Sequence, residues 1–583
     1  MLFSNNFKKL AKNKTFARFL PAIFIILISI PAVQATIRPG FFPHHDDLQA
    51  MRQLQMDKCV KDLQIPCRWV PDMGYGFGFP LFNYYPPLPY YIGEVFHLIG
   101  FSFLDTVKVL FILAILLSGF SMYIFAKEFF GKLGGLVSAS FYIYAPYHAV
   151  DVYVRGAMNE SWAFVFFPLI LWSIYKLITT EKSIFVLFLS LFTAFLAISH
   201  LPTLMIFAPG AILWTALNLL FVKRWASLPE LITSGVLSLA LSAFFVLPVV
   251  FEQKFAHTET LFIGYFNYLA HFLNLNQLFL QRYWGYGESV LGPVDTMSFS
   301  IGHLHWIGTI FAFLFAFLIR KKSPQISIII VFFFLWTYFY TFLAHQRAGP
   351  IWEVITPLAW LQFPWRFLAL TMVGTSFLAG AILILAQNLT KNFRILIAGA
   401  IIAAVIILNF QFFTWREFYP DLTDEKKFSG KLWQLQQTAG IFDYLPKQLK
   451  LPPADPPDGD AKIILGDGTF VKVKKQSNLQ IYDVKVNSST AEFQINTFYF
   501  PGWKVFANEK EVKIDAYRDK INGTMIVDLQ KGEHQVVAKF SETNVRLISD
   551  IISAVSWLVL LIAFGYFVLK KIKFQRLAIS HKQ

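Results

Sequence analysis

The sequence has 583 residues, of which 56% are hydrophobic, 18% aromatic and only 15% charged, with a mean hydropathy of +0.51. A chain this apolar exceeds what one soluble core can bury, so lipid is its main solvent. The formal net charge of +15 does not indicate nucleic-acid binding, because lysines and arginines stand in short runs between apolar segments, where cytoplasmic loops carry them.

About twelve apolar segments are long enough to cross a hydrocarbon core of roughly 30 Å, which takes about 20 helical residues. They lie near residues 16–36, 104–126, 131–149, 160–178, 184–199, 203–222, 230–251, 303–320, 326–344, 365–386, 394–413 and 547–569. The first segment is either a retained helix or a signal peptide, since lysines precede it and Val33-Gln34-Ala35 provides small residues for cleavage. We favour a retained helix, and both alternatives give the same topology.

Basic residues occupy every second connector between these segments. They stand at the N-terminus, in 127–132, 176–182, 223–224, 320–322 and 391–394, and in the tail 570–573. Because cytoplasmic loops carry the excess of lysine and arginine, both termini are predicted to be cytoplasmic. The connectors 37–103, 147–159, 199–202, 252–302, 345–364 and 414–546 then lie outside. The sequence therefore predicts a multi-pass plasma-membrane protein with its active site on the extracytoplasmic face.

Residues 414–546 differ from the rest of the chain, because after a linker rich in proline and aspartate at 451–459 the apolar residues alternate with a period of two. This pattern predicts a small extracytoplasmic β-sandwich. Trp503, which follows a Pro-Gly turn, should pack in its core instead of forming a platform for sugar. The predicted domains are 1–413, a transmembrane domain with a catalytic outer loop at 37–103; 414–546, the linker and β domain; and 547–583, a final helix with a basic tail.

The first outer loop contains two adjacent carboxylates after two histidines, in the order His44-His45-Asp46-Asp47. Apolar residues then recur at near-helical spacing from 48 to 59, which predicts an amphipathic helix lying in the membrane interface. The aspartates either cap this helix or act as functional groups, and a cap needs only one of them. Cys59 and Cys67 form either one disulfide or two free thiols.

Residues 65–91 are dense in glycine, proline and aromatic side chains, a composition that argues against a regular helix. Such a stretch suits either a cavity for sugar or lipid, or an aromatic belt at the membrane interface. The sequence leaves these two alternatives open.

The other outer loops are short but polar, and arginine is a common ligand of phosphate. Their candidate residues are Asp151, Arg155, Asn159, Glu160, His200, Arg347 and Arg366. Arg366 could instead only extend its charge to the membrane surface, and His200 could be structural. The helix interiors hold almost no charged residue, which is atypical of ion-coupled transporters.

With a first helix, an outer loop carrying an acidic pair, many helices and an external β domain, the chain resembles the GT-C superfamily of membrane glycosyltransferases. Over nearly its whole length it more closely resembles bacterial membrane proteins labelled 6-pyruvoyl-tetrahydropterin synthase-related, akin to the YfhO-like group. The motifs that carry this likeness are His45-Asp46-Asp47, Pro66-Cys67-Arg68-Trp69, the stretch 74–88, Ser199-His200-Leu201-Pro202-Thr203, Phe363-Pro364-Trp365-Arg366-Phe367 and Tyr499-Phe500-Pro501-Gly502-Trp503-Lys504. A soluble pterin synthase would need a zinc-binding histidine cluster, which this sequence lacks.

The resemblance implies a polyprenyl-phosphate-linked sugar as donor and an extracytoplasmic glycan, lipid or protein as acceptor. We predict that Asp46 takes the proton from the acceptor hydroxyl, with Asp47 orienting it or replacing it, and that His45 keeps the carboxylate ionised. Cations would neutralise the leaving phosphate. The residues expected to bind substrate are Arg366 first, then Arg155 and His200, with Glu160 and Arg347 beside them. Dependence on a divalent cation, Mg²⁺ or Mn²⁺, stays open.

The leading hypothesis is therefore an inverting glycosyltransferase of the bacterial envelope. The alternatives are a flippase or transporter of lipid or polysaccharide, and a non-catalytic envelope scaffold whose β domain binds glycan. A transporter is disfavoured by the uncharged helix interiors. A scaffold would leave the acidic pair without a role.

Overall fold

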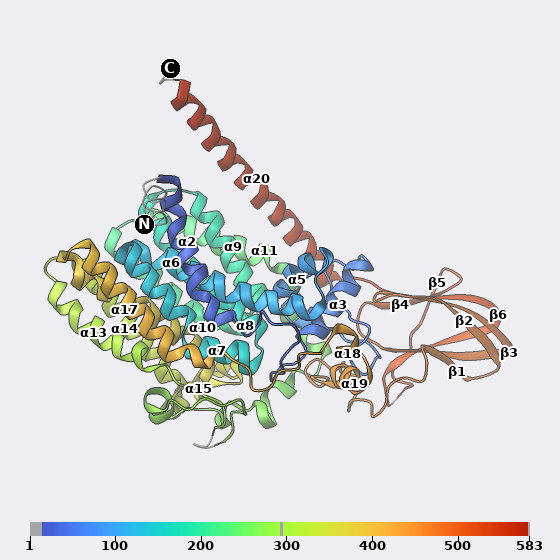
Figure 1. The fold of residues 1–583 in the computed structure, drawn as a ribbon. Coiled ribbons are helices and arrows are strands. Elements are labelled where there is room, and N and C mark those ends of the chain that lie inside the picture. The colour runs from blue at the N-terminus through green and yellow to red at the C-terminus, as the bar shows by residue number, and fades with distance from the viewer. Residues whose placement is uncertain (1–13, 292–294, 520, 581–583) are drawn as a thin grey trace, which may run out of the picture. The chain divides into compact units, whose positions relative to one another are not determined.

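The computed structural model describes residues 14–291, 295–519 and 521–580, which form a mostly helical protein with one antiparallel sheet (Figure 1). The chain divides into two compact units. The first unit comprises Met1–Asp46, Lys108–Gly235 and Tyr265–Asp421, and the second comprises Asp47–Val107, Val236–Gly264 and Leu422–Gln583. The first outer loop from Asp47 onward thus clusters with the C-terminal sheet, an association that the predicted domains, which follow chain order, do not include.

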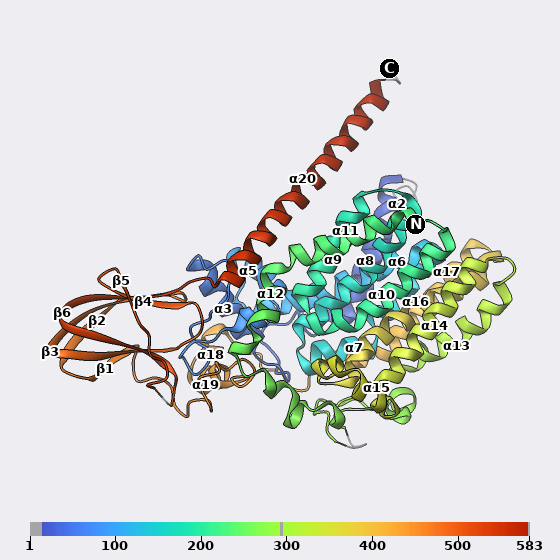
Figure 2. The ribbon, with the colours of Figure 1, turned by 180° about the vertical axis from the view of Figure 1, so that it is seen from behind.

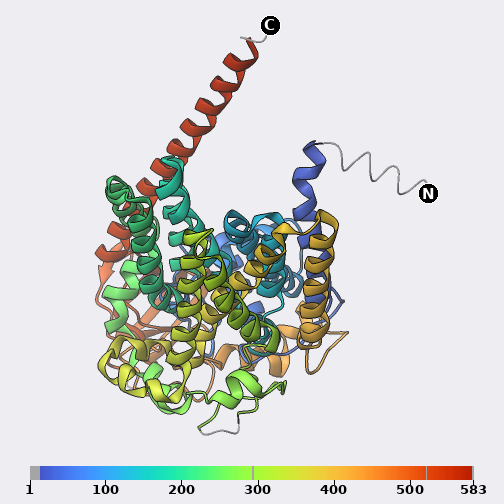
Figure 3. The same cartoon turned by 90° about the vertical axis from the view of Figure 1, so that its left-hand side faces the viewer.

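Long apolar helices make up most of the first unit and run roughly side by side (Figure 3). They are α2 (Lys14–Val33), α6 (Phe103–Ile143), α8 (Met158–Thr180), α9 (Ile184–Ser199), α10 (Leu201–Val222), α11 (Leu228–Leu241), α13 (His303–Ile319), α14 (Pro324–Ala344), α16 (Leu368–Leu385) and α17 (Lys391–Asn409), with the short helices α7 (Pro146–Ala149) and α15 (Gly349–Val354) between them. Because a helix satisfies its own backbone hydrogen bonds, such segments are stable in lipid.

Seven helices among the described residues are long and apolar enough to cross a membrane, or eight if Trp225–Leu241 and Ala243–Phe255, bent by 73°, form one span. Three further apolar helices, Phe19–Val33, Ile184–Ser199 and His303–Ile319, are shorter. Gly131 interrupts α6 with a φ of 69°, at the place where the sequence predicts two separate segments. The chain is therefore a multi-pass membrane protein, and the number of about twelve spans stays a prediction.

The second unit combines short helices, the sheet and the last helix. The helices are α3 (Gln49–Lys61), α4 (Leu81–Tyr84), α5 (Leu88–Leu98), α12 (Ala243–Glu252), α18 (Asp424–Lys427), α19 (Gly430–Thr438) and α20 (Asn544–Ser580). The strands are β1 (Ala461–Leu465), β2 (Gly468–Lys475), β3 (Leu479–Phe498), β4 (Trp503–Ala507), β5 (Lys510–Val512) and β6 (Thr524–Phe540). Their order is β1-β3-β6-β4-β5, with β2 also paired to β3 (Figure 2).

The predicted β-sandwich is one antiparallel sheet, because all six strands belong to a single hydrogen-bonded sheet. The long strands β3 and β6 run through both halves of it, and their register shifts between Val486 and Thr490. Rings from the two halves nevertheless meet, since the centroid of Phe493 lies 5.5 Å from that of Tyr482. Apolar residues that recur with a period of two predict strands. They do not predict whether one long strand pairs with neighbours in both halves of a sheet.

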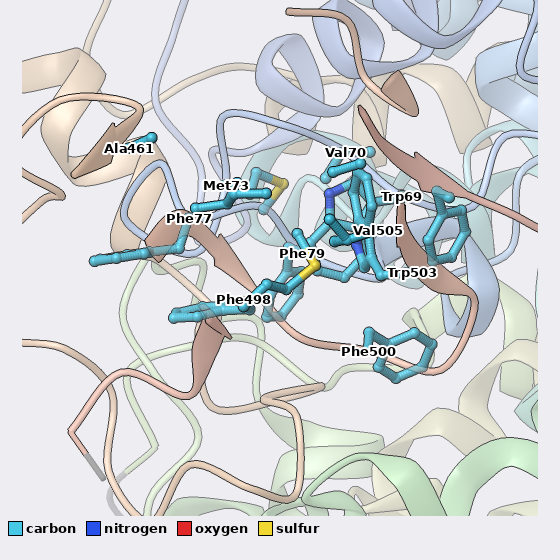
Figure 4. Close-up of a cluster of buried hydrophobic side chains, with 14 of the residues drawn as sticks. Trp69, Val70, Met73, Phe77, Phe79, Ala461, Phe498, Phe500, Trp503 and Val505 are labelled. Atoms are coloured by element: carbon cyan, nitrogen blue, oxygen red, sulfur yellow. The ribbon is translucent and has the colours of Figure 1, made fainter. Parts of the chain in front are cut away.

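Most of the large side chains of residues 65–91 pack into the core of the second unit (Figure 4). Trp69 lies edge-on to Trp503 at 5.6 Å, and Phe77 stacks on Phe498 at 4.9 Å. Trp503 is 3% exposed, so its predicted core position is confirmed. Helices α4 and α5 begin within this stretch, contrary to the prediction that it holds no regular helix.

Helix α3 is largely buried within the second unit, although its sequence predicts a position in the membrane interface. Most of its residues, polar ones included, are buried. Gln53 donates a hydrogen bond to Glu94 of α5 over 3.1 Å, which explains why a polar residue can be buried here. Cys59 and Cys67 form a disulfide, which settles the alternative that the sequence leaves open.

Candidate functional site

A cluster of buried polar side chains in the first unit contains several of the predicted site residues. We call Tyr147, Asp151, Arg155, Glu160 and Arg366 the outer charge cluster, after the loops that the sequence predicts to lie outside. Arg155 ends a π-helix, Val150–Arg155, a wide turn that is frequent at functional sites. Its Nη1 donates to Glu160 Oε2 over 2.8 Å and also pairs with Asp151. Tyr147 donates its hydroxyl hydrogen to Glu160 Oε1 over 2.6 Å.

A second guanidinium reaches the same carboxylate from a segment about two hundred residues further along the chain. Arg366 lies in the 3-10 helix Pro364–Phe367, and its Nε is 3.6 Å from Glu160 Oε2. Its Nη1 donates to the carbonyl oxygen of Leu361 over 2.7 Å, which fixes the side chain. Glu160 is 1% exposed and stands between the two arginines.

The backbone of the first outer loop is hydrogen-bonded to the backbone that carries Arg155. The N–H of His45 donates to the carbonyl oxygen of Val154 over 3.0 Å, and that of Asp46 donates to Arg155 over 2.9 Å. The His45 ring nitrogen Nε2 lies 3.0 Å from the carbonyl oxygen of Tyr286. The half-buried Asp46 is thus held beside the outer charge cluster by consecutive main-chain hydrogen bonds.

Gly156 makes this arrangement possible. Its φ of +64° is a left-handed conformation, and a Cβ there would lie 2.2 Å from the ring nitrogen Nδ1 of His44. Both the backbone and the space therefore require glycine. The turn that ends the π-helix is shaped so that His44 packs against it.

Asp47 belongs to the second unit and has an ion-pair partner there. Its Oδ2 lies 2.7 Å from Nζ of Lys427, a residue that is 2% exposed. The N-cap of α3 is Leu48, which makes no side-chain cap hydrogen bond. Asp47 thus pairs with a lysine of the second unit, whereas the backbone of Asp46 is bound to the segment of Arg155.

His200 lies at the N-cap of α10, with its Nδ1 3.2 Å from the hydroxyl of Thr203. Desolvation, together with Arg366 and Arg155, lowers the pKa of His200 to about 3, although Glu160 opposes the shift. The ring is therefore neutral at pH 7. The prediction that His200 supplies a positive charge to phosphate is at odds with this environment, and a neutral ring can offer only a hydrogen bond.

Arg347 has an exposed side chain in the 3-10 helix Gln346–Ala348. Its backbone N–H donates to the ring nitrogen Nδ1 of His345 over 3.1 Å. Among the described residues, its guanidinium has no contact with the outer charge cluster. Of the three predicted arginines, the structure therefore brings together Arg155 and Arg366.

The surroundings of the cluster set its charges. Burial lowers the pKa of Arg155, but the facing carboxylates of Asp151 and Glu160 outweigh burial and raise it. Burial raises the pKa of Asp151 in spite of Arg155, and it also raises that of Tyr147. Arg155 is thus permanently charged, Tyr147 is a hydrogen-bond donor, and Asp151 is biased toward its neutral form.

Sequence reasoning did not single out Tyr147, Trp365 or Lys427. A signal for Tyr147 exists, because Tyr147, Asp151 and Arg155 recur every four residues and so fall on one face of a helical segment. No local pattern links Lys427 to Asp47. The described residues hold no group of three or more His, Cys, Asp or Glu side chains that could bind a metal ion.

No family model matches the sequence. A curated Lactococcus lactis protein, described only as uncharacterized, is 26% identical over 245 residues, which are 40% of this chain and 39% of that protein. Among solved structures, the apo oligosaccharyltransferase of Archaeoglobus fulgidus has a TM-score of 0.40 at 12% identity, over 69% of this chain and 56% of that one. The mycobacterial arabinofuranosyltransferase AftD has a TM-score of 0.42 at 11% identity, over 68% and 27%. The chain spans less than two thirds of the length of each of these proteins.

Proposed function

We propose that the protein is a membrane glycosyltransferase of the GT-C type, which moves a sugar from a polyprenyl-phosphate donor to an acceptor on the extracytoplasmic face. The observation that carries this proposal is the outer charge cluster, in which two guanidinium groups meet at Glu160 beside the backbone of Asp46. The resemblance of the chain to that superfamily, in its first helix, its acidic pair, its many helices and its β domain, supports the same reaction class.

The cluster has the charge that an anionic leaving group needs. Protonation of Asp151, the direction in which burial moves its pKa, would leave two guanidinium groups facing one charged carboxylate, Glu160. The positive charge then in excess would lie in a buried environment, where it attracts an anion more strongly than it would in water. Guanidinium groups can also bind phosphate oxygens through paired hydrogen bonds. The cluster therefore suits the phosphate that links the sugar to its lipid.

In the proposed reaction, Asp46 acts as general base. The acceptor hydroxyl oxygen attacks the anomeric carbon and forms a new C–O bond, while its proton passes to the Asp46 carboxylate. The bond between the anomeric carbon and the phosphate oxygen breaks, and polyprenyl phosphate leaves with the electron pair toward Arg155 and Arg366. Attack opposite to the leaving group inverts the anomeric configuration.

The test compares Asp46→Asn with Asp47→Asn in the purified full-length protein. A panel of polyprenyl-phosphate-linked sugars, labelled in the sugar, would be supplied. The rate at which the label leaves the polyprenyl phosphate would be measured. Asp46→Asn should lose about a hundredfold to ten-thousandfold in rate, as expected for a general base, while it still binds the donor. Asp47→Asn should mainly lose its ion pair with Lys427. Near wild-type transfer by Asp46→Asn would remove Asp46 from this role.

A further inference from the structure

Two stacked rings support the two guanidinium groups of the outer charge cluster. The ring of Phe363 stacks on that of Trp365, with centroids 4.7 Å apart and planes 20° apart. The guanidinium carbon of Arg155 lies 4.5 Å from the Trp365 ring centroid, and that of Arg366 lies 5.0 Å from the Phe363 centroid. Each arginine therefore rests against one ring of the pair, an attraction that strengthens when the cation is desolvated.

Further rings hold this pair in place. His271 lies 4.7 Å from Phe363 in an edge-on arrangement, and Phe299 lies 5.6 Å from Trp365. Both residues belong to the outer segment 265–302 of the first unit. The orientation of the two guanidinium groups is thus set by aromatic packing as well as by Glu160.

The indole N–H of Trp365 is a hydrogen-bond donor to which the described residues offer no acceptor. Trp365 is 3% exposed, and its Nε1 has no hydrogen-bond partner among the described residues. A buried donor without a partner is costly, so such groups call for an explanation, and a ligand is one. Trp162, Trp284 and Trp503 also have buried, unpartnered indole nitrogens, but none of these rings has a guanidinium over it among the described residues.

We propose that Trp365 is a further substrate-binding residue, whose indole N–H donates to the donor phosphate held by Arg155 and Arg366, and that Phe363 positions both the indole and Arg366. This inference rests on the proposed function. The phosphate would then receive hydrogen bonds from the guanidinium groups of Arg155 and Arg366 and from the indole N–H of Trp365. The stacked rings of Phe363 and Trp365 hold these donors in place. Such preorganised donors need no rearrangement when charge develops on the leaving oxygen.

The test uses protein labelled with 5-fluorotryptophan and ¹⁹F NMR. The Trp365 resonance is the one missing from Trp365→Phe, and it should shift when undecaprenyl phosphate is added but not when undecaprenol is added. The resonance of Trp503, in the core of the second unit, serves as the control and should not move. Binding itself is measured in parallel by calorimetry.

The outcomes separate the two proposals. If undecaprenyl phosphate binds but the Trp365 resonance stays in place, this inference is overturned and the proposed function stands. If the phosphate does not bind at all, both fall. Trp365→Phe keeps a ring but loses the N–H, so it should bind undecaprenyl phosphate about ten- to a hundredfold more weakly, with unchanged binding of undecaprenol.

Phe363 is tested by its effect on the same two ligands. Phe363→Leu should weaken binding of the phosphate but not of the alcohol, and Phe363→Tyr, which keeps the stacked ring, should restore it. A merely structural role would lower thermal stability in Phe363→Leu and change the binding of both ligands equally. That equal loss would contradict the positioning role.

Discussion

Within the described residues, each unit has a cluster of ion pairs around two arginines, and the two clusters are built differently. In the second unit, Arg68 pairs with Glu542 over 3.1 Å and with Asp550 over 2.6 Å, and Arg546 pairs with Glu252 over 2.8 Å. There, two arginines face three carboxylates. In the outer charge cluster, two arginines share Glu160, and Asp151 is biased toward its neutral form.

The difference shows that burial of charge does not by itself mark a functional site. The cluster of Arg68 and Arg546 joins the loop after α3, the end of α12 and the start of α20, and its ion pairs hold elements of the second unit together. Its carboxylates outnumber its arginines, although Glu542 among them is exposed. In the outer charge cluster, protonation of Asp151 would leave the two arginines in excess, and that excess would attract an anion. The balance of charge in each cluster, and not burial alone, distinguishes the two.

The largest expected effect comes from breaking the cluster of the second unit. Arg546→Ala would leave Glu252, which is 1% exposed, without its guanidinium. Removing one partner of a buried ion pair typically costs about 3–5 kcal/mol of folding free energy. Denaturant unfolding of the purified protein would measure the loss. A change below about 1 kcal/mol would show that this cluster is not a structural lock.

A buried carboxylate without a guanidinium partner provides the next test. Burial, and then the nearby Asp57, raise the pKa of Glu94 from 4.5 to about 7. Between these values the folded protein holds more protons than the unfolded chain, so stability falls as the pH rises from 4.5 to 7 and the penalty is fully present above pH 7.

Glu94→Gln removes this charge and keeps the shape of the side chain. It should therefore stabilise the protein on the order of 2 kcal/mol at pH 8 and have little effect near pH 4.5. Thermal melts of both proteins across this pH range are the measurement. An equal difference at both pH values would mean that ionisation of Glu94 is not the cause.

A third variant tests the turn beside Arg155. Gly156→Ala adds a Cβ that would meet the His44 ring at a positive φ, at a cost of about 1–3 kcal/mol, and it should also reduce transfer by displacing Arg155. Gly131→Ala is the matched control, because Gly131 has a φ of +69° and no atom within 4 Å of its added Cβ. If both variants lose transfer equally, backbone strain and not the contact with His44 is responsible.

The features that follow from composition and local period could be predicted from the sequence. The length of the apolar segments predicted the helices, because a segment in lipid must satisfy its own backbone hydrogen bonds. The alternation of apolar and polar residues predicted the strands. Placement of the polar loops on one face predicted that Arg155 and Arg366 could meet, which they do at Glu160.

The features that depend on packing between distant segments could not be predicted from the sequence. The burial of α3, the ion pair of Asp47 with Lys427 and the neutral state of His200 all arise from residues far away in the sequence. The sharing of β3 and β6 between both halves of the sheet has the same origin. Periodicity identifies an element and its apolar face, but not the partner that covers it.

The most direct test of the central claim compares two conservative variants, Arg366→Lys and Arg546→Lys, for binding of undecaprenyl phosphate by calorimetry. Lysine keeps the charge but loses the paired hydrogen bonds of the guanidinium. The account predicts about ten- to a hundredfold weaker binding for Arg366→Lys and unchanged binding for Arg546→Lys, whatever its stability. Wild-type affinity in Arg366→Lys, or an equal loss in both variants, would contradict the assignment of phosphate to the outer charge cluster.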